Sequence, residues 1–544
     1  MNDNISKKRY FQVVDAILLM ILALLGFSNA ILMMLHGINS ERLSITALYD
    51  ALMVDKLDFA GWNFSEAPQF FPDIPLFFLS KWIFPNLIYS YTLNVIFLLG
   101  LISIFCLLLI KTLKLSSIET FYYLSLTLLT LSAILSSSYN SIFELFWPIL
   151  HGGGIICGLA LIILAIYTIH RRYNYFSMVI QLILAVLLIT SDSLIISQYL
   201  LPILSAMIIS SILGIICWRI TLKTFISYSM GYIISQLILW FLRTYLHFSI
   251  PNLSLHKCAI DWFISDFRHA GIKPEFVSTI LCVIACAVTL IMNRKILNRS
   301  KAESSETTIT GIFLAVFFLS QALIAIIAPI TIGTWYDIIP MVYFSALWVV
   351  SPILIIWFLA FNLSARGLLN HWLKNVVIGG LLIFSLYNNL SFLITTKISI
   401  DAPYPVQAQC IDDAAREFSV KFAYGDYSMA KYVTYLSKSG LKVRQVDTNL
   451  NPYTRLIHNQ WLNNAPLPHG KQPVMFLTKD LNTHLIIERY NKPDMIRNCP
   501  EVGRLFVYFS GAEEKNYSPQ SRRETQRKDK KLFTTESQRN AEKR

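Results

Sequence analysis

The feature that most constrains the fold of this chain is an apolar run that recurs between the N-terminus and about residue 396. Each run has about 18 to 25 residues, which is long enough for a helix to cross a hydrocarbon core of roughly 30 Å. The spans must be helices because lipid offers no hydrogen-bond partner to backbone N–H and C=O groups. We expect about eleven spans, at residues 11–35, 87–110, 119–136, 149–169, 176–190, 197–216, 225–244, 276–292, 309–330, 338–361 and 375–396.

The charge pattern favours a membrane over a nucleic acid as the partner of this chain. Charged residues make up 15% of the sequence, against roughly 25% in soluble domains. The net charge of +13 is spread over short basic clusters between the apolar runs and a basic C-terminus. Clusters of this kind set membrane topology. We therefore expect membrane lipid around the chain and no nucleic-acid partner.

The same clusters orient the spans. Basic residues such as Arg9, Arg171 and Arg219 fall in connections on the side of the N-terminus, whereas the longer connections on the opposite side hold few. The positive-inside rule places the N-terminus in the cytoplasm, and an odd number of spans then places the C-terminal segment in the periplasm or cell exterior. The first run is too long for a cleaved signal peptide, so we interpret it as a retained anchor. The expected location is a bacterial inner membrane.

The sequence changes character after about residue 400. Strands are predicted over 420–424, 441–446, 474–478 and 504–509, with helices over 428–439 and 481–490. Their alternation predicts a small α/β domain over 397–512, following a membrane domain over 1–396. The charged segment 513–544 has few large apolar residues and is predicted to be disordered. Cys410 and Cys499 bracket the domain and form a disulfide in an oxidising compartment, or are two unpaired buried thiols.

The first outer loop, residues 37–86, carries the candidate chemistry. Asp73 lies among aromatic residues and prolines in the stretch 70–78. Carboxylates against apolar surface are desolvated, which raises their pKa and makes them candidate bases. The alternative is that these acids solvate the loop. The acids of the loop are Glu41, Asp50, Asp55, Asp58, Glu66 and Asp73.

This arrangement resembles the GT-C membrane glycosyltransferases, which include the protein mannosyltransferases and the aminoarabinose transferases of lipid A. The resemblance rests on a carboxylate soon after the first span and an acidic, proline-containing stretch before the second. It implies a polytopic helical membrane protein with a C-terminal α/β domain and catalysis on the outer face. The implied substrates are a polyisoprenyl-phosphate sugar donor and a glycan, lipid or protein acceptor. The paired acids of the mannosyltransferase pattern are absent from this loop, since Asp412-Asp413 and Glu513-Glu514 lie after residue 400.

The resemblance also implies roles for the acids. Asp50 is the first candidate for the base that deprotonates the acceptor, and Asp55 is its alternative. Asp73 and Glu66 would orient the acceptor or hold a divalent cation such as Mg²⁺ or Mn²⁺, and no cofactor is certain.

A leaving lipid phosphate needs cationic groups near the outer interface. The candidates are Arg243, His247, Lys257, Arg268 and His269, which could equally pair with lipid head groups.

Two further sites are candidate substrate contacts. His151 precedes three glycines, which permit close backbone approach, and could contact a sugar, a phosphate or a head group. Asp192 lies in a tight outer turn, where it could line the site or cap the following helix.

Two other functions compete with the glycosyltransferase hypothesis. A polyisoprenoid-glycan flippase or transporter should have ionisable residues or broken helices near the middle of the membrane, and the spans hold almost none. A glycan polymerase should have arginines in its outer loops, where arginine is scarce. The position of the acids therefore favours surface chemistry.

Overall fold

The computed structural model describes residues 2–36, 38–65, 67–137, 151–170, 175–248, 274–293, 305–332, 341–364, 379–380, 382–384, 386–387, 404–464, 472–500 and 502–509. The chain forms two compact units. The membrane unit comprises Met1–Ile38, Leu52–Ala60 and Phe64–Pro403. The C-terminal unit comprises Tyr404–Arg544 together with two pieces of the first loop, Asn39–Ala51 and Gly61–Asn63.

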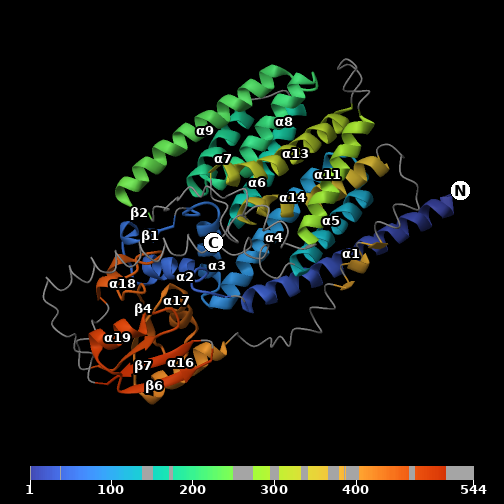
Figure 1. The fold of residues 1–544 in the computed structure, drawn as a ribbon. Helices are drawn as coiled ribbons and strands as arrows, with labels where there is room; N and C mark the ends of the chain where they lie inside the picture. The colour runs from blue at the N-terminus through green and yellow to red at the C-terminus, as the bar shows by residue number, and fades with distance from the viewer. Residues whose placement is uncertain are drawn as a thin grey trace, which may run out of the picture. The chain divides into compact units, whose positions relative to one another are not determined.

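The membrane unit is built from apolar helices that lie side by side (Figure 1). Within the described residues, seven of them are long and apolar enough to cross a membrane. The chain is therefore a helical membrane protein. The seven helices are α1 (Asn2–His36), α4 (Leu87–Lys111), α5 (Ser117–Ser137), α6 (Gly152–His170), α9 (Trp218–Tyr245), α13 (Glu306–Ile332) and α14 (Met341–Ser364).

Three other predicted spans are shorter apolar helices. They are α7 (Tyr175–Ser191), the continuous pair η4 (Ile196–Leu200) and α8 (Leu201–Ile212), and α11 (Pro274–Met292). The segment predicted as the last span, 375–396, lies mostly outside the described residues. The tight turn between α7 and η4 carries Asp192, and it brings this polar residue to the end of two apolar helices.

The first loop contains more regular structure than its sequence predicts. Its elements are α2 (Ser44–Tyr49), η1 (Asp50–Val54), η2 (Phe59–Gly61), β1 (Asn63–Phe64) and α3 (Asp73–Ile83). Asn86 then caps α4, because its side chain accepts hydrogen bonds from the backbone N–H groups of Ile88 and Tyr89. This cap ends the loop and starts the second apolar run.

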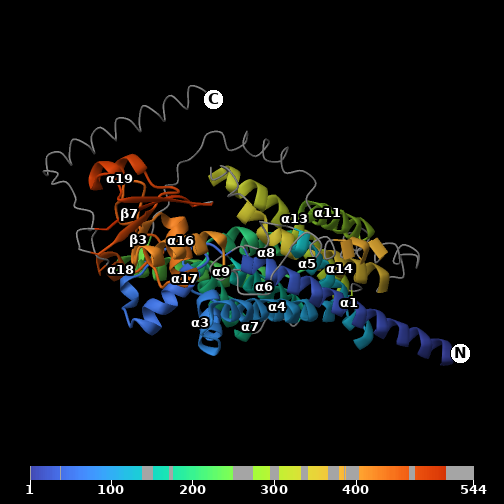
Figure 2. The same cartoon turned by 90° about the horizontal axis from the view of Figure 1, so that it is seen from below.

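The C-terminal unit contains a five-stranded mixed sheet in the order β4-β3-β5-β7-β6. The central strand β3 (Phe422–Gly425) is parallel to β4 (Lys442–Gln445) and to β5 (Val474–Leu477). The strands β7 (Gly503–Tyr508) and β6 (Met495–Cys499) continue the sheet in antiparallel pairing. Helices α16 (Val406–Glu417) and α17 (Tyr427–Leu436) cover one face, and α19 (Thr483–Tyr490) covers the other (Figure 2).

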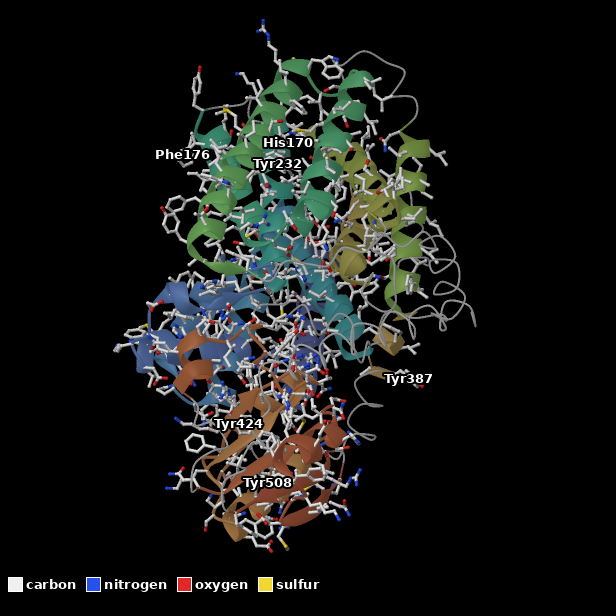
Figure 3. All side chains as sticks on the ribbon, turned by 60° about the vertical axis from the view of Figure 1, so that its left-hand side comes forward. His170, Phe176, Tyr232, Tyr387, Tyr424 and Tyr508 are labelled. Carbon is white, nitrogen blue, oxygen red and sulfur yellow. A yellow bond between two sulfur atoms is a disulfide. The ribbon has the colours of Figure 1, made fainter. Side chains whose placement is uncertain are left out.

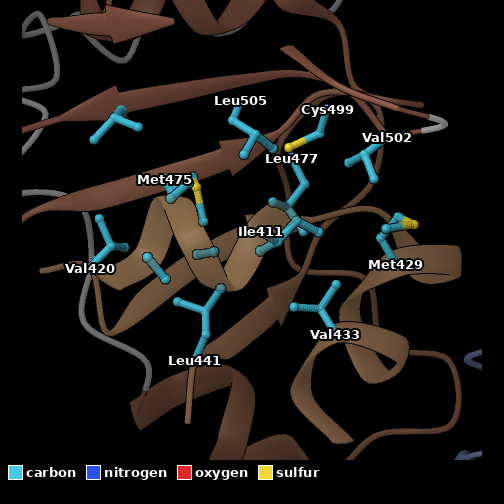
Figure 4. Close-up of a cluster of buried hydrophobic side chains, with 14 residues drawn as sticks. Ile411, Val420, Met429, Val433, Leu441, Met475, Leu477, Cys499, Val502 and Leu505 are labelled. Atoms are coloured by element: carbon cyan, nitrogen blue, oxygen red, sulfur yellow. The ribbon is translucent and has the colours of Figure 1, made fainter. Parts of the chain in front are cut away.

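The two faces follow from the alternation of side chains along each strand. Met475, Leu477 and Leu505 point towards α16 and α17, where they pack with Ile411 and Val433 (Figure 4). The next residues in the strands point the other way and form a second core against α19. That core includes Tyr424, Phe476, Phe506, Tyr508 and Ile486, of which Tyr424 and Tyr508 are labelled in Figure 3.

The observed elements can be compared with the predicted ones. The four predicted strands correspond to β3, β4, β5 and β7, and the two predicted helices to α17 and α19. Helix α16, strand β6 and the short helix α18 (Asn459–Asn464) have no predicted counterpart. The cysteines expected to pair, Cys410 and Cys499, are joined in a disulfide with Cα atoms 5.8 Å apart. The tail 513–544 lies outside the described residues.

Candidate functional site

Asp73 begins α3 and lies against the first turn of α6. Its Oδ1 accepts a hydrogen bond from the backbone N–H of Gly153, with 3.1 Å between the two atoms. The contact requires glycine, since a Cβ at position 153 would overlap Oδ2 of Asp73 and the ring of Pro72. The N-terminus of a helix also favours negative charge, because its N–H groups point outwards. The sequence Gly152–Gly154 therefore provides the surface on which this carboxyl lies.

Burial perturbs the proton affinity of Asp73. The residue is 1% exposed, and its Oδ2 has no hydrogen-bond partner among the described residues. Desolvation raises its pKa from 3.8 to about 7, opposed by the Gly153 N–H and the charge of His151 and assisted by the charge of Asp192. At neutral pH the protonated and ionised forms of Asp73 are therefore similarly populated.

His151 and Asp192 form an ion pair beside Asp73. The ring atom Nδ1 of His151 is hydrogen-bonded to Oδ2 of Asp192, which is 2% exposed. Since a carboxylate can only accept, Nδ1 must carry a proton. Burial acts to raise the pKa of Asp192, but the charge and hydrogen bond of His151 hold it below its ordinary value. Asp192 is thus the ionised acid of the site.

The turn that carries Asp192 is itself fixed by hydrogen bonds. Its Oδ1 accepts from the backbone N–H of Leu194, 3.0 Å away, so this carboxylate also caps the turn after α7. His151 has a backbone φ of +68°, a conformation that costs a residue with a Cβ about 1 kcal/mol or more. His151 adopts this backbone conformation directly before α6, and its side chain is directed towards Asp192.

Gln69 connects the first loop to the same turn. Its backbone N–H donates to the carbonyl of Ser191 over 3.0 Å, and the N–H of Phe71 donates to Ser191 Oγ over 2.8 Å. The amide Nε2 of Gln69 lies 3.4 Å from Nδ1 of His151. Because His151 Nδ1 already donates its proton to Asp192, we interpret its proximity to Gln69 Nε2 as a packing contact and not as a hydrogen bond. The Gln69 amide is instead hydrogen-bonded to Asp192. Oε1 of Gln69 is buried and has no partner among the described residues.

An aromatic cluster lies next to Gln69. Phe70 contacts Phe64, with ring centroids 5.2 Å apart, and Phe248, with centroids 6.5 Å apart. Phe64 and Phe248 also contact each other at 5.7 Å, and Phe59 completes the cluster. Since Phe248 belongs to β2 (His247–Phe248), directly after α9, the cluster holds the end of α9 against the first loop.

The chemistry of the site is that of a proton acceptor. Its three titratable groups are two carboxyls and one imidazole. The two buried atoms that lack a partner within the described part of the chain, Asp73 Oδ2 and Gln69 Oε1, are both oxygens. Buried acceptors without donors are costly, so the site suits a molecule that brings hydroxyl or amine donors. A phosphate would be repelled by the negative charge of the carboxylates in this site. Among the described residues, no group of three or more His, Cys, Asp or Glu side chains could hold a metal ion. This part of the chain therefore offers no set of ligands for the divalent cation considered from the sequence.

The predicted site residues are distributed unevenly. Asp73, His151 and Asp192 come together, although the sequence places them in three separate segments. Asp50 is half-buried at the start of η1 and belongs to the C-terminal unit, whereas Asp55 is exposed and belongs to the membrane unit. Arg243 is exposed in the last turn of α9, and His247 is exposed in β2. Four further candidates, Glu66, Lys257, Arg268 and His269, lie outside the described residues.

Sequence reasoning missed Gln69. Nothing in its neighbourhood distinguishes it from any other polar loop residue, and its role depends on tertiary contacts with Ser191, His151 and Asp192. The contact between Gly153 and Asp73 had a partial signal, because three successive glycines indicate close approach of another group. The identity of that group could not be read from the sequence.

Comparison with known proteins finds no family model, no curated protein and no solved structure that matches this chain.

Proposed function

We propose that this protein is a membrane glycosyltransferase that moves a sugar from a polyisoprenyl-phosphate donor to an acceptor hydroxyl or amine of an envelope glycan, lipid or protein. The observation that supports this proposal is the carboxyl of Asp73, buried between α3 and α6 with a pKa of about 7. General bases work best when their pKa lies near the operating pH. The resemblance of the first loop to GT-C enzymes supplies the reaction class.

In the proposed reaction, the acceptor hydroxyl donates its proton to Oδ2 of Asp73, the oxygen without a partner among the described residues. The acceptor oxygen then forms a bond to C1 of the sugar, and the bond from C1 to the phosphate oxygen breaks. The electron pair leaves with the lipid phosphate. General-base catalysis of this kind typically contributes about 10²- to 10⁴-fold in rate.

His151 and Asp192 serve to orient this base. Their ion pair places a positive and a negative charge beside Asp73. The positive charge limits how far burial raises the pKa of Asp73, and the negative charge keeps the site attractive to hydroxyl or ammonium donors. Gln69 Oε1 is an additional acceptor for a second hydroxyl of the same substrate.

The donor phosphate must be bound by other groups, since the site of Asp73 repels anions. Within the membrane unit, Phe248 contacts Phe64 and Phe70, so the end of α9 lies next to the loop that carries Asp73. Arg243 is in the last turn of α9. We assign Arg243 to the phosphate of the donor and the Asp73 site to the acceptor.

The topology we propose has about eleven spans, with a cytoplasmic N-terminus and with the Asp73 site and the C-terminal unit outside. It is supported by the excess of basic residues in alternate connections. A reporter fused after residue 400 should be active only outside the cytoplasm. Activity inside would contradict this orientation.

The experiment uses purified full-length protein in nanodiscs with a panel of polyisoprenyl-phosphate sugars, and mass spectrometry to detect released polyisoprenyl phosphate. Asp73→Asn should lower the rate at least 100-fold, whereas Asp413→Asn, an exposed carboxylate on α16, should match the wild type. Asp50→Asn and Asp55→Asn distinguish the other candidate bases. Normal turnover by Asp73→Asn would overturn the assignment of the base.

A proton-coupled transporter is the second candidate, and the near-complete burial of Asp73 and Asp192 favours it. Ionisable residues buried in membrane proteins often carry protons. In proteoliposomes, a transporter would accumulate its glycan in response to a pH gradient, and Asp73→Asn would abolish accumulation. An enzyme would instead form a covalent product without any gradient.

A further inference from the structure

Helix α3, in the membrane unit, has an exposed face that is entirely apolar. The buried residues of this helix recur three or four positions apart, so they share one face, and two of the three are polar. They are Asp73, Phe77 and Ser80. The exposed residues lie on the opposite side of the helix and form what we call its apolar face. They are Pro75, Leu79, Trp82 and Ile83. A helix on the surface of a soluble domain has the reverse pattern, with its polar residues facing water.

The buried face of α3 packs against the beginning of α4, a helix long and apolar enough to cross a membrane (Figure 1). The rings of Phe77 and Tyr91 are both fully buried, with centroids 5.0 Å apart. At the end of α3, the exposed ring of Phe84 contacts the exposed ring of Tyr89, with centroids 6.2 Å apart. Since α4 begins at Leu87, both contacts are made within its first two turns. Helix α3 therefore lies where the chain enters the membrane.

The apolar face of α3 is continuous with the exposed side of α4. The exposed residues of α4 before Lys111 are spaced four or seven positions apart, so they form one stripe along the helix. They are Tyr89, Ile96, Gly100, Ile104 and Leu108. On a membrane-spanning helix, such a stripe faces the lipid. The contact between Phe84 and Tyr89 joins this stripe to the exposed end of α3, which indicates that lipid covers both surfaces.

The length of α3 determines how it can meet the lipid. Its 11 residues extend over about 16 Å, whereas a hydrocarbon core is roughly 30 Å thick. Phe84 is extended after the helix, Pro85 follows, and Asn86 caps α4, so α3 and α4 are separate helices. A short helix with one apolar face lies along the interface instead of crossing it. Trp82, which is 72% exposed, suits this depth because its ring is apolar and its N–H is polar.

We propose that α3 is an interfacial helix whose apolar face, together with Phe84, is embedded in a phospholipid bilayer at the boundary between head groups and acyl chains. The one basic residue of α3 does not oppose this position. Lys81 is half-buried and lies outside the apolar face, and its Nζ donates to the carbonyl of Pro85 over 2.6 Å. Because Asp73 is the first residue of α3, docking of this helix holds the Asp73 site at the surface of the membrane.

The experiment measures the depth of single nitroxide labels on full-length protein in phospholipid nanodiscs. Labels are attached to Trp82→Cys, to Ile104→Cys in the exposed stripe of α4, and to Asn449→Cys, an exposed polar position of the C-terminal unit. The background carries serine at the exposed Cys217 and at Cys258. Collisions with oxygen, which concentrates in hydrocarbon, are compared with collisions with a nickel chelate, which stays in water. The ratio of oxygen to nickel collisions at Trp82→Cys should be several-fold above that at Asn449→Cys and below that at Ile104→Cys.

Other positions of α3 provide the matched controls. Leu79→Cys and Ile83→Cys should give ratios close to that of Trp82→Cys, whereas a label at Ser80→Cys, on the buried face, should collide with neither reagent. Two outcomes would overturn the proposal. Nickel collisions at Trp82→Cys equal to those at Asn449→Cys would show that the apolar face lies in water. Shielding of Trp82→Cys from both reagents, with spin–spin broadening that unlabelled protein removes, would show that a second copy of the chain covers this face.

A conservative variant guards against misfolding of the cysteine variants. Trp82→Phe keeps an aromatic ring and removes one of the 11 tryptophans of the chain. In nanodiscs whose lipids carry bromine near the top of their acyl chains, tryptophan fluorescence should be quenched more in the wild type than in Trp82→Phe, relative to unbrominated lipid. Equal quenching of the two proteins would contradict the proposal. Neither readout requires glycosyl transfer, so the result is independent of the proposed function.

Discussion

His151 donates its Nδ1 proton to Asp192 across a separation of 41 residues, and this ion pair distinguishes the two acids of the site. Asp192 has a cationic partner and a lowered pKa. Asp73 is buried to the same degree, but its carboxyl accepts hydrogen bonds from backbone N–H groups, that of Gly153 among them, and its pKa is raised to about 7. Two neighbouring carboxyls thus have pKa values shifted in opposite directions, which is the arrangement that separates a base from an orienting acid.

The first prediction concerns the stability of Asp73→Asn. The pKa of Asp73 is about 7 in the folded protein, against an ordinary value of 3.8 for an unfolded chain. Between these pH values the folded state binds more protons, so the free energy of unfolding falls as pH rises, by at most about 4 kcal/mol. Asn cannot ionise and lacks this decline. In thermal melts, the wild type should lose more stability from pH 5 to pH 8 than Asp73→Asn does.

Asp413→Asn provides the control for that measurement, because it removes an exposed carboxylate from the C-terminal unit. Its melting temperature should follow the wild type at both pH values. If Asp73→Asn and the wild type lost stability in parallel, the carboxyl of Asp73 would have an ordinary pKa and could not be the near-neutral base.

The second prediction concerns His151→Asn. Asparagine tolerates the positive φ of residue 151, so this change removes the ring and its charge with little effect on the backbone. His151 lowers the pKa of both Asp73 and Asp192. Dicyclohexylcarbodiimide modifies protonated carboxyls in apolar surroundings, and the pH at which labelling of Asp73 is half-maximal is its carbodiimide midpoint. Without His151, this midpoint should rise by about one pH unit, and Asp192 should become labelled near neutral pH. An unlabelled Asp192 in this variant would show that its ionised state does not depend on His151.

The helices of the membrane unit were predictable because lipid imposes a length and an apolar composition on them. The runs that became α4, α6 and α13 needed no tertiary information. Helix α3 was harder, since it starts directly after Pro72 and its aromatic residues suit a loop as well as a helix. The distribution of the first loop over two units could not be predicted, because it depends on contacts between residues far apart in the sequence, such as Ser40 and Ser428.

The sequence allowed the residue types of the site to be predicted, but not the contacts between them. The acids of the first loop and the glycines after His151 could be identified from the sequence. Position along the chain gave Asp50 priority over Asp73, but it carries no information on burial. The proton affinity of Asp73 arises from its position against Gly153, and that of Asp192 from His151. These relationships exist only after α3, α6 and α7 have packed.

The third prediction concerns the disulfide between Cys410 and Cys499. It joins α16 to the end of β6 across a sequence separation of 89 residues. A cross-link over a loop of this size typically contributes about 2 to 4 kcal/mol, mainly by restricting the unfolded chain. The double change Cys410→Ser and Cys499→Ser should make the C-terminal unit more susceptible to limited proteolysis and leave the carbodiimide midpoint of Asp73 near pH 7. Equal proteolysis of the variant and the wild type would show that this cross-link contributes little.

The fourth prediction compares two glycines in membrane helices. A Cβ at position 153 would overlap Asp73 Oδ2 and Pro72, whereas a Cβ at position 100, in α4, would meet nothing within 4 Å. Gly153→Ala should therefore displace the carboxyl of Asp73, lower its carbodiimide midpoint and reduce glycosyl transfer by at least about tenfold, since small displacements of catalytic groups are costly. Gly100→Ala makes the same chemical change and should leave both quantities at wild-type values. Equal behaviour of the two variants would mean that Asp73 does not depend on the backbone of Gly153, and the base would then have to be sought among the other acids of the first loop.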